Sequence, residues 1–157
     1  MKTIYDFTCI KNGAKTKAFP LIGKGTARKV YDLNNGYVAK IAIGQKGISQ
    51  NETESDLSGD TYMKLFAEVQ SHNEDYSIII MEKCKRVKSI KALKILLDKG
   101  DGQDLEENWN DIQNELILNY DLGSDSNRIS SWGMDKDGNV KLVDYGCTID
   151  VWRKHYR

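Results

Sequence analysis

Apolar and polar residues alternate through the first part of the chain in a way that predicts strands. Residues 18–22 and 29–33 flank a glycine-containing turn. Asn34-Asn35-Gly36 then supplies a tight turn, because asparagine and glycine tolerate the positive φ that such turns need. A third strand is predicted over residues 37–43. Three strands joined by short turns predict an antiparallel meander.

The middle of the chain predicts one helix and one buried strand. Gly44–Gly47 indicates a loop, and Ser49 is a candidate cap for the helix after it. Apolar positions recur at helical spacing from residue 54 to residue 69, with Gly59 as a weak point. The stripe consists of Leu57, Thr61, Met63, Leu65, Phe66 and Val69. Residues 76–81 predict a strand that is apolar on both faces.

The second half predicts helices and one hairpin. Residues 88–97 and 105–118 carry apolar positions at helical spacing, and residues 121–131 are polar and irregular. Residues 132–134 and 140–143 predict two strands, since an aspartate-glycine turn signal lies between them. Strands therefore dominate one half of the chain and helices the other, which predicts an α+β fold.

Charge and composition narrow the classes of partner. The 157 residues include 23 Lys+Arg and 23 Asp+Glu, so no basic surplus favours nucleic acid or an anionic membrane. The longest apolar run, Ile78–Met81, is too short to cross a bilayer, and the first residues lack a signal-peptide core. Cys9, Cys84 and Cys147 are expected to be free thiols. We therefore expect a cytoplasmic protein that binds neither nucleic acid nor membrane.

Two glycines between the first two predicted strands are candidates for phosphate binding. Gly23 and Gly25 lack Cβ atoms, so backbone N–H groups beside them can approach phosphate oxygens. Lys24, Arg28 and Lys29 would add positive charge nearby. The alternative is an ordinary glycine hairpin.

Lys40 lies inside an apolar strand and therefore needs either solvent or a partner, because a buried unpaired ammonium is costly. Glu52, Glu54 and Asp56 are the nearby acidic residues. Glu54 is the favoured partner because it shares a helix face with Leu57, and Glu52 is the reserve choice. The alternative is that these carboxylates only favour a helix N-terminus.

Two further segments carry candidate chemistry. Residues 82–84 lead out of the buried strand as a polar connector, which could be a plain exit or could offer backbone groups to an adenine edge. Asp144-Tyr145-Gly146 follows an apolar strand, which places one carboxylate at a sheet edge. Such a carboxylate can bind a metal ion beside a phosphate, although any hairpin strand can end in Asp and Gly.

Taken in order, these residues resemble the protein-kinase superfamily, and in size they resemble small kinase-like proteins of phages and prophages. The resemblance implies a minimal bilobal fold, with an antiparallel sheet and one helix over residues 1–83. A reduced helical lobe with a β-hairpin would follow over residues 84–157. It implies ATP and Mg²⁺ as cofactors, with Asp144 as the metal ligand. The implied nucleotide-binding residues are Gly23, Gly25, Val30, Lys40, Glu54, Glu82 and Cys84.

The chain departs from the family at the catalytic loop. It contains no His-Arg-Asp, and counting back from Asp144 places Ser131 at the family's Asn position and Ser126 at its catalytic Asp position. A slip of one residue would bring Asp125 into the place of the base, although Asp125 also suits a turn. Thirteen residues, 145–157, follow Asp144, so we expect no activation segment and no helices that dock a peptide substrate.

Three functions therefore stay open. The leading hypothesis is a kinase-fold regulator without the full catalytic loop, which binds nucleotide or a protein partner such as a host protein. The second is an active minimal phosphotransferase that uses Asp125 as base. The third is an α+β adaptor that binds a partner protein without nucleotide, with Trp132, Trp152 and Tyr156 as candidate anchors. For Trp132, packing under the hairpin is the favoured alternative.

Overall fold

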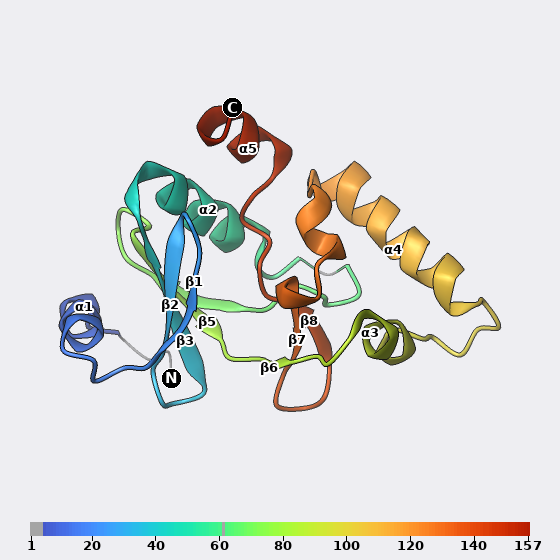
Figure 1. The fold of residues 1–157 in the computed structure, drawn as a ribbon, viewed down its shortest axis with the longest axis horizontal. Helices are drawn as coiled ribbons and strands as arrows, with labels where there is room; N and C mark the ends of the chain where they lie inside the picture. The colour runs from blue at the N-terminus through green and yellow to red at the C-terminus, as the bar shows by residue number, and fades with distance from the viewer. Residues whose placement is uncertain (1–4, 61) are drawn as a thin grey trace. The chain divides into compact units, whose positions relative to one another are not determined.

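The structure, a computed structural model, describes residues 5–60 and 62–157. Within them the chain is an α+β protein with five α-helices, one five-stranded antiparallel sheet and one three-stranded antiparallel sheet (Figure 1). The fold class predicted from the sequence is thus confirmed at this level. The chain forms two compact units, each described here by itself. The first runs to Ser58 and resumes over Glu68–Lys83, and the second comprises Gly59–Ala67 and Cys84–Arg157.

The first unit is built on the five-stranded sheet, in which the strands lie in the order β1-β2-β3-β5-β4. The strands are β1 (Leu21–Lys24), β2 (Arg28–Asp32), β3 (Tyr37–Ala42), β4 (Val69–His72) and β5 (Ile78–Glu82). The predicted meander is confirmed in β1–β3. Asn34 and Gly36 adopt φ of 59° and 89° in the turn between β2 and β3, as expected for a tight Asn/Gly turn.

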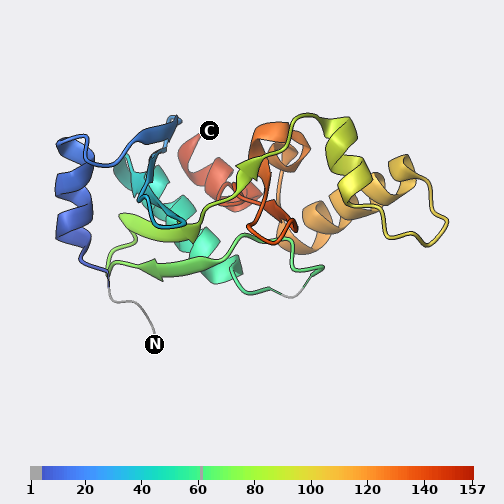
Figure 2. The same cartoon turned by 90° about the horizontal axis from the view of Figure 1, so that it is seen from below.

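Both faces of this sheet are covered, each by a different helix (Figures 1 and 2). On one face, Ile78 and Ile80 of β5 pack with Ala39 of β3 and with Ile10 of α1 (Phe7–Lys15). Helix α1 begins at Phe7 because the Asp6 carboxylate accepts the N–H of Cys9. The sequence analysis predicted only strands before residue 43, so it missed helix α1.

The opposite face carries Lys40, which lies beside Ile79 of β5 in the antiparallel register. Directly paired residues share a face, so Lys40 and Ile79 point toward α2 (Gly44–Leu57). Ile79 and Ile80 are both fully buried although they point to opposite faces. The prediction that this strand is apolar and buried on both sides is therefore confirmed.

Helix α2 starts ten residues earlier than the predicted pattern. The Gly44–Gly47 loop was a wrong prediction, because these residues form the first turn of the helix. The cap is Ile43 without a side-chain hydrogen bond, so Ser49 does not cap it. Gly44 has φ of 69°, a left-handed value that lets the chain turn directly from β3 into α2.

The predicted continuation of this helix to residue 69 was also wrong. The helix ends at Leu57, and Gly59 follows it with φ of 88°. Phe66 pairs with Leu142 in an isolated bridge, and Val69 opens β4. Thr61 of the predicted stripe lies outside the described residues. Of the stripe, Leu65 and Phe66 are buried in the segment after the helix and Met63 is exposed, an arrangement that helical spacing alone did not reveal.

The second unit contains the predicted two helices and the hairpin. Its helices are α3 (Ile90–Leu96), α4 (Leu105–Tyr120) and α5 (Ile149–His155), and its strands are β6 (Lys85–Arg86), β7 (Trp132–Met134) and β8 (Val140–Leu142). Helices α3 and α4 pack against each other (Figure 2). Ser89, Asp104 and Thr148 cap the three helices through side-chain oxygens that accept backbone N–H groups. β6 and α5 were not predicted.

Trp132 belongs to the core of the second unit. Its side chain is buried, its indole N–H donates to the carbonyl of Ser126 at 2.8 Å, and its ring lies 6.0 Å from that of Trp109. The favoured prediction that Trp132 packs under the hairpin is confirmed, so Trp132 is not a surface anchor. Across the described part of the chain, no helix combines the length and apolar character needed to cross a membrane.

Candidate functional site

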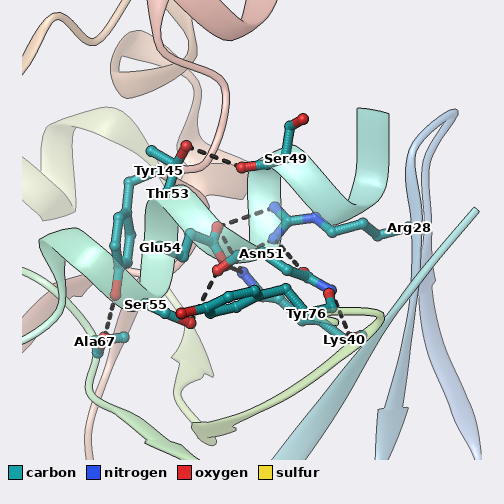
Figure 3. Close-up of polar contacts among 10 residues, drawn as sticks. All are labelled: Arg28, Lys40, Ser49, Asn51, Thr53, Glu54, Ser55, Ala67, Tyr76 and Tyr145. Atoms are coloured by element: carbon teal, nitrogen blue, oxygen red, sulfur yellow. Dashed lines mark hydrogen bonds and ion pairs between the residues drawn. The ribbon is translucent and has the colours of Figure 1, made fainter. Parts of the chain in front are cut away.

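A buried ion pair joins the sheet of the first unit to helix α2. Lys40 lies in the middle of β3, and its Nζ donates to both carboxylate oxygens of Glu54, at 3.0 and 2.9 Å (Figure 3). Glu54 lies in the last turns of α2 and is completely buried, and Lys40 is 5% exposed. The predicted pairing of Lys40 with Glu54, rather than with Glu52, is confirmed.

Arg28 is a second cation on the same carboxylate, and the sequence analysis did not predict this contact. Its Nη1 and Nη2 donate to the two oxygens of Glu54 at 2.7 and 2.9 Å, and Nη1 also lies 3.2 Å from Oδ1 of Asn51. Arg28 is buried, so it is part of an internal cluster rather than a surface cation of the glycine turn. Each Glu54 oxygen therefore accepts from both an arginine and a lysine.

The two cations decide the ionisation of Glu54. Burial alone would raise the pKa of this carboxyl, but the positive charges of Arg28 and then Lys40 outweigh burial and hold the pKa at about 2. Glu54 is therefore ionised at neutral pH despite being completely buried.

Asn51 connects this cluster to the backbone around it. Its amide nitrogen donates to the carbonyls of Tyr76, at 2.7 Å, and Lys40, at 3.3 Å. The backbone carbonyl of Asn51 accepts a hydrogen bond from the Ser55 hydroxyl at 2.9 Å. A buried polar network whose members are paired in this way fixes one arrangement of the elements that carry it. Here those elements are α2, β3 and the turn before β5.

The glycine turn forms the hairpin between β1 and β2. Gly23 pairs with Val30 in the register, and the N–H of Gly25 donates to the carbonyl of Arg28 at 2.9 Å. A Cβ atom at Gly25 would meet no heavy atom within 4 Å, and its φ lies outside the left-handed range. The turn therefore requires no glycine at position 25 for its own geometry. Phosphate binding by Gly23, Gly25 and Val30 stays a prediction.

The predicted connector, residues 82–84, overlaps the end of β5 and is already engaged in hydrogen bonds. The N–H of Glu82 donates to the carbonyl of Glu68 at 2.9 Å, and the N–H of Lys83 donates to the carbonyl of Gly36 at 3.0 Å. Met81, just before them, is buried. An adenine edge would therefore need backbone groups other than these two N–H groups. The role predicted for Glu82 and Cys84 stays a prediction, with Cys84 belonging to the second unit.

Asp144 lies in the second unit, shortly after β8. Its side chain is exposed, whereas the next residue, Tyr145, is buried and donates its hydroxyl to the carbonyl of Ala67 at 2.6 Å (Figure 3). The Tyr145 ring also packs edge-on against Phe66, with ring centroids 4.9 Å apart. The buried tyrosine thus anchors the segment and leaves the preceding carboxylate at the surface of this unit.

The two serines at the expected catalytic positions are structural. Ser126 is buried, and its Oγ donates to Oε1 of Gln113 at 2.7 Å. The backbone carbonyl of Ser126 accepts from Gln113 and Trp132. Ser131 is also buried, and its carbonyl accepts the N–H of Val143 at 2.7 Å. These positions hold the hairpin and α4 together rather than presenting polar groups to a substrate.

Asp125 and Asp144 interact electrostatically within the second unit. Burial, and then the negative charge of Asp144, raise the pKa of Asp125, and Arg128 at 3.4 Å opposes this rise. Mg²⁺ takes hard oxygen donors such as carboxylates, and binding of Mg²⁺ by Asp144 stays a prediction. Among the described residues, no group of three or more His, Cys, Asp and Glu side chains is arranged to hold a metal ion.

The titration of Asp125 tests this interaction. We expect Asp144→Asn to lower the pKa of Asp125, because the substitution removes a neighbouring negative charge, and Arg128→Gln to raise it. Carboxyl ¹³C NMR through a pH titration measures both changes. Asp137→Asn, an exposed aspartate of the β7–β8 turn, is the control and should leave the pKa of Asp125 unchanged. An unchanged titration in Asp144→Asn would show that the two carboxylates do not interact.

Comparison with known proteins adds no relative to these observations. No family model matches the chain, and no curated protein matches it either. The functional interpretation therefore depends on the geometry of the two units and on the resemblance carried by the motifs.

Proposed function

We propose that this protein is a kinase-fold regulator that binds nucleotide or a partner protein and lacks the full catalytic loop. The observation that carries the proposal is the buried pair of Lys40 on β3 and Glu54 on α2, placed on one face of an antiparallel sheet. In the family that the chain resembles, such a lysine contacts nucleotide phosphates. The proposal assigns this contact to the first unit and the metal-binding carboxylate, Asp144, to the second.

The absence of efficient phosphotransfer is part of the proposal. Ser126 and Ser131 replace the catalytic Asp and the metal-binding Asn that the family uses, and both serines are buried in structural contacts. A neutral hydroxyl is a weaker Mg²⁺ ligand than a carboxylate or an amide oxygen. The chain therefore retains the groups for binding phosphate and lacks two of the groups for transferring it.

Isothermal titration with ATP and Mg²⁺ tests the proposal. We expect saturable binding to the wild type and a loss of about tenfold or more in affinity for Lys40→Met, because the charged contact to phosphate is removed. Gly25→Ala should also weaken binding, since its Cβ enters space that a phosphate would use, while its melting temperature stays unchanged. Lys11→Met, an exposed lysine on α1, is the matched control. Absence of heat with millimolar ATP would overturn nucleotide binding.

An active phosphotransferase is the second candidate, and the pair of Asp125 and Asp144 favours it. The raised pKa of Asp125 makes this carboxylate a better proton acceptor than an ordinary aspartate. Transfer of the γ-phosphoryl group from labelled ATP would be abolished by Asp144→Ala and by Lys40→Met. Equal label in the wild type and both variants would eliminate this candidate.

If nucleotide does not bind, the hypothesis that remains is binding of a partner protein. Trp152 on α5 is 50% exposed, and Arg153 and Lys154 follow it. An exposed tryptophan beside cations is a suitable anchor for a partner surface. Tyr156, the other predicted anchor in this segment, is partly buried.

A further inference from the structure

We infer that Arg28 is a positioning residue that holds Glu54 toward the sheet and compensates its charge, so that the Lys40 ammonium can engage an anionic ligand. The contacts of Arg28 carry this inference. Its planar guanidinium reaches both oxygens of Glu54, at 2.7 and 2.9 Å, in a two-pronged contact. The role of Lys40 toward a phosphate depends on the proposed function, but the role of Arg28 toward Glu54 does not.

The energetic reason is the cost of leaving a buried charge without its partner. If Lys40 were the sole cation near Glu54, any shift of its ammonium toward a ligand would leave a completely buried carboxylate uncompensated. Breaking a buried ion pair in that way is strongly destabilising. With Arg28 in contact with both oxygens, Glu54 keeps a cation when Lys40 moves, so the movement of Lys40 is much less costly.

Arginine is suited to this role in a way that lysine is not. A guanidinium stays protonated at any pH at which the protein is folded, and its rigid fork matches the two oxygens of a carboxylate. A lysine ammonium is a compact charge on a flexible stem, which suits a group that changes partner. The chain therefore uses each kind of cation where its chemistry fits, with arginine as the fixed partner and lysine as the movable one.

The same guanidinium also fixes the orientation of α2. Asn51 and Glu54 lie three residues apart on one face of the helix, and Arg28 contacts both. Asn51 in turn donates to the carbonyls of Lys40 and Tyr76. One side chain of β2 thus ties two successive turns of α2 to the sheet. Loss of Arg28 should loosen Glu54 even when Lys40 is intact.

The first arm of the test needs no nucleotide. It follows the Glu54 carboxyl by ¹³C NMR in a pH titration of the wild type, Arg28→Met, Arg28→Lys and Lys40→Met. We expect the pKa of Glu54 to rise further in Arg28→Met than in Lys40→Met, with Arg28→Lys between the wild type and Arg28→Met. If Arg28→Met does not fold, the comparison of Arg28→Lys with Lys40→Met decides. A pKa of Glu54 that responds to Lys40→Met alone would overturn the inference.

The second arm measures ATP affinity by calorimetry in the same variants. We expect Arg28→Met to weaken ATP binding about tenfold although Lys40 is unchanged, and Arg28→Lys to recover part of that loss. ATP affinity equal to wild type in both Arg28 variants would overturn the claim that Arg28 supports Lys40. If the wild type binds no ATP, the nucleotide-binding part of the proposed function fails, while the pKa arm still decides the role of Arg28 toward Glu54.

Discussion

Replacing Glu54 with glutamine should destabilise the protein by about 3–5 kcal/mol, because the substitution leaves two cations beside a group that no longer compensates them. Arg28 and Lys40 are both nearly completely buried and both donate to the Glu54 carboxylate. Glutamine keeps the volume but replaces one accepting oxygen with an NH₂ donor, so the variant loses the charge and the hydrogen bonds to that oxygen. Urea unfolding at neutral pH, followed by circular dichroism, measures the free energy of unfolding.

Glu52→Gln provides the matched control for this prediction. Glu52 lies on the same helix, undergoes the same chemical change, and is exposed. Surface substitutions of this kind change stability by less than about 0.5 kcal/mol. If Glu54→Gln and Glu52→Gln destabilise the protein equally, the buried cluster does not contribute to stability as its geometry indicates.

The same cluster makes the stability of the fold depend on pH in the acid range. The pKa of Glu54 is about 2 in the folded chain, below its ordinary value in an unfolded chain. A carboxyl with a lowered folded pKa contributes stability that is complete above the unfolded pKa and is lost as the pH falls toward the folded one. The difference in unfolding free energy between wild type and Glu54→Gln should therefore shrink as the pH falls from about 5 toward 2.

Six of the strands, β1–β3, β5, β7 and β8, and the helices α3 and α4 could be predicted because their patterns are local. The Asn34-Asn35-Gly36 turn fixes the hairpin between β2 and β3, and residues 78–81 form an apolar run that only a central strand buries on both faces. Helix α4 carries its buried residues at helical spacing. These signals require no knowledge of the rest of the chain.

The missed elements are those whose burial depends on distant contacts. Helix α1 buries a single side chain, Ile10, and α5 buries only Val151, so neither shows a continuous apolar stripe. Helix α2 carries glycines at positions 44 and 47 in its first turn and buries polar residues, among them Asn51 and Glu54. Its inner face is polar because it contacts an ion cluster, and a search for apolar periodicity therefore shifted the predicted helix toward the C-terminus.

The candidate site, too, was predicted in part and missed in part. Lys40 and Glu54 could be paired from the sequence because a lysine buried in an apolar strand needs a partner and Glu54 shares a helix face with Leu57. Arg28 could have been placed from the strand register. Arg28 pairs with Ala42 and Val30 pairs with Lys40, so these residues lie on the same side of the sheet. The sequence analysis instead treated Arg28 as a cation of the glycine turn, because its predicted strand began at residue 29. Extending the alternation of this strand two residues back from Val30 would have placed Arg28 on the same face as Lys40.

Gly47→Ala is the second change with a large expected effect, although alanine favours helices more than glycine does. Gly47 lies in the first turn of α2, where a Cβ atom would be 2.1 Å from the carbonyl oxygen of Ala27 and 2.9 Å from Cα of Ala42. These are backbone atoms of the turn before β2 and of β3, and they cannot rotate away. The helix start must therefore move off the sheet, at a cost of about 2–3 kcal/mol.

That displacement would also disturb the ion cluster, because Glu54 is carried by the same rigid helix. Urea unfolding measures the loss of stability, and the Glu54 carboxyl signal reports whether the contacts with Arg28 and Lys40 persist. Gly25→Ala is the control, since its Cβ would meet no heavy atom within 4 Å, and we expect a change below about 0.5 kcal/mol. A Gly47→Ala variant as stable as Gly25→Ala would contradict the close seating of α2 on the sheet, and with it the position from which Glu54 reaches both cations.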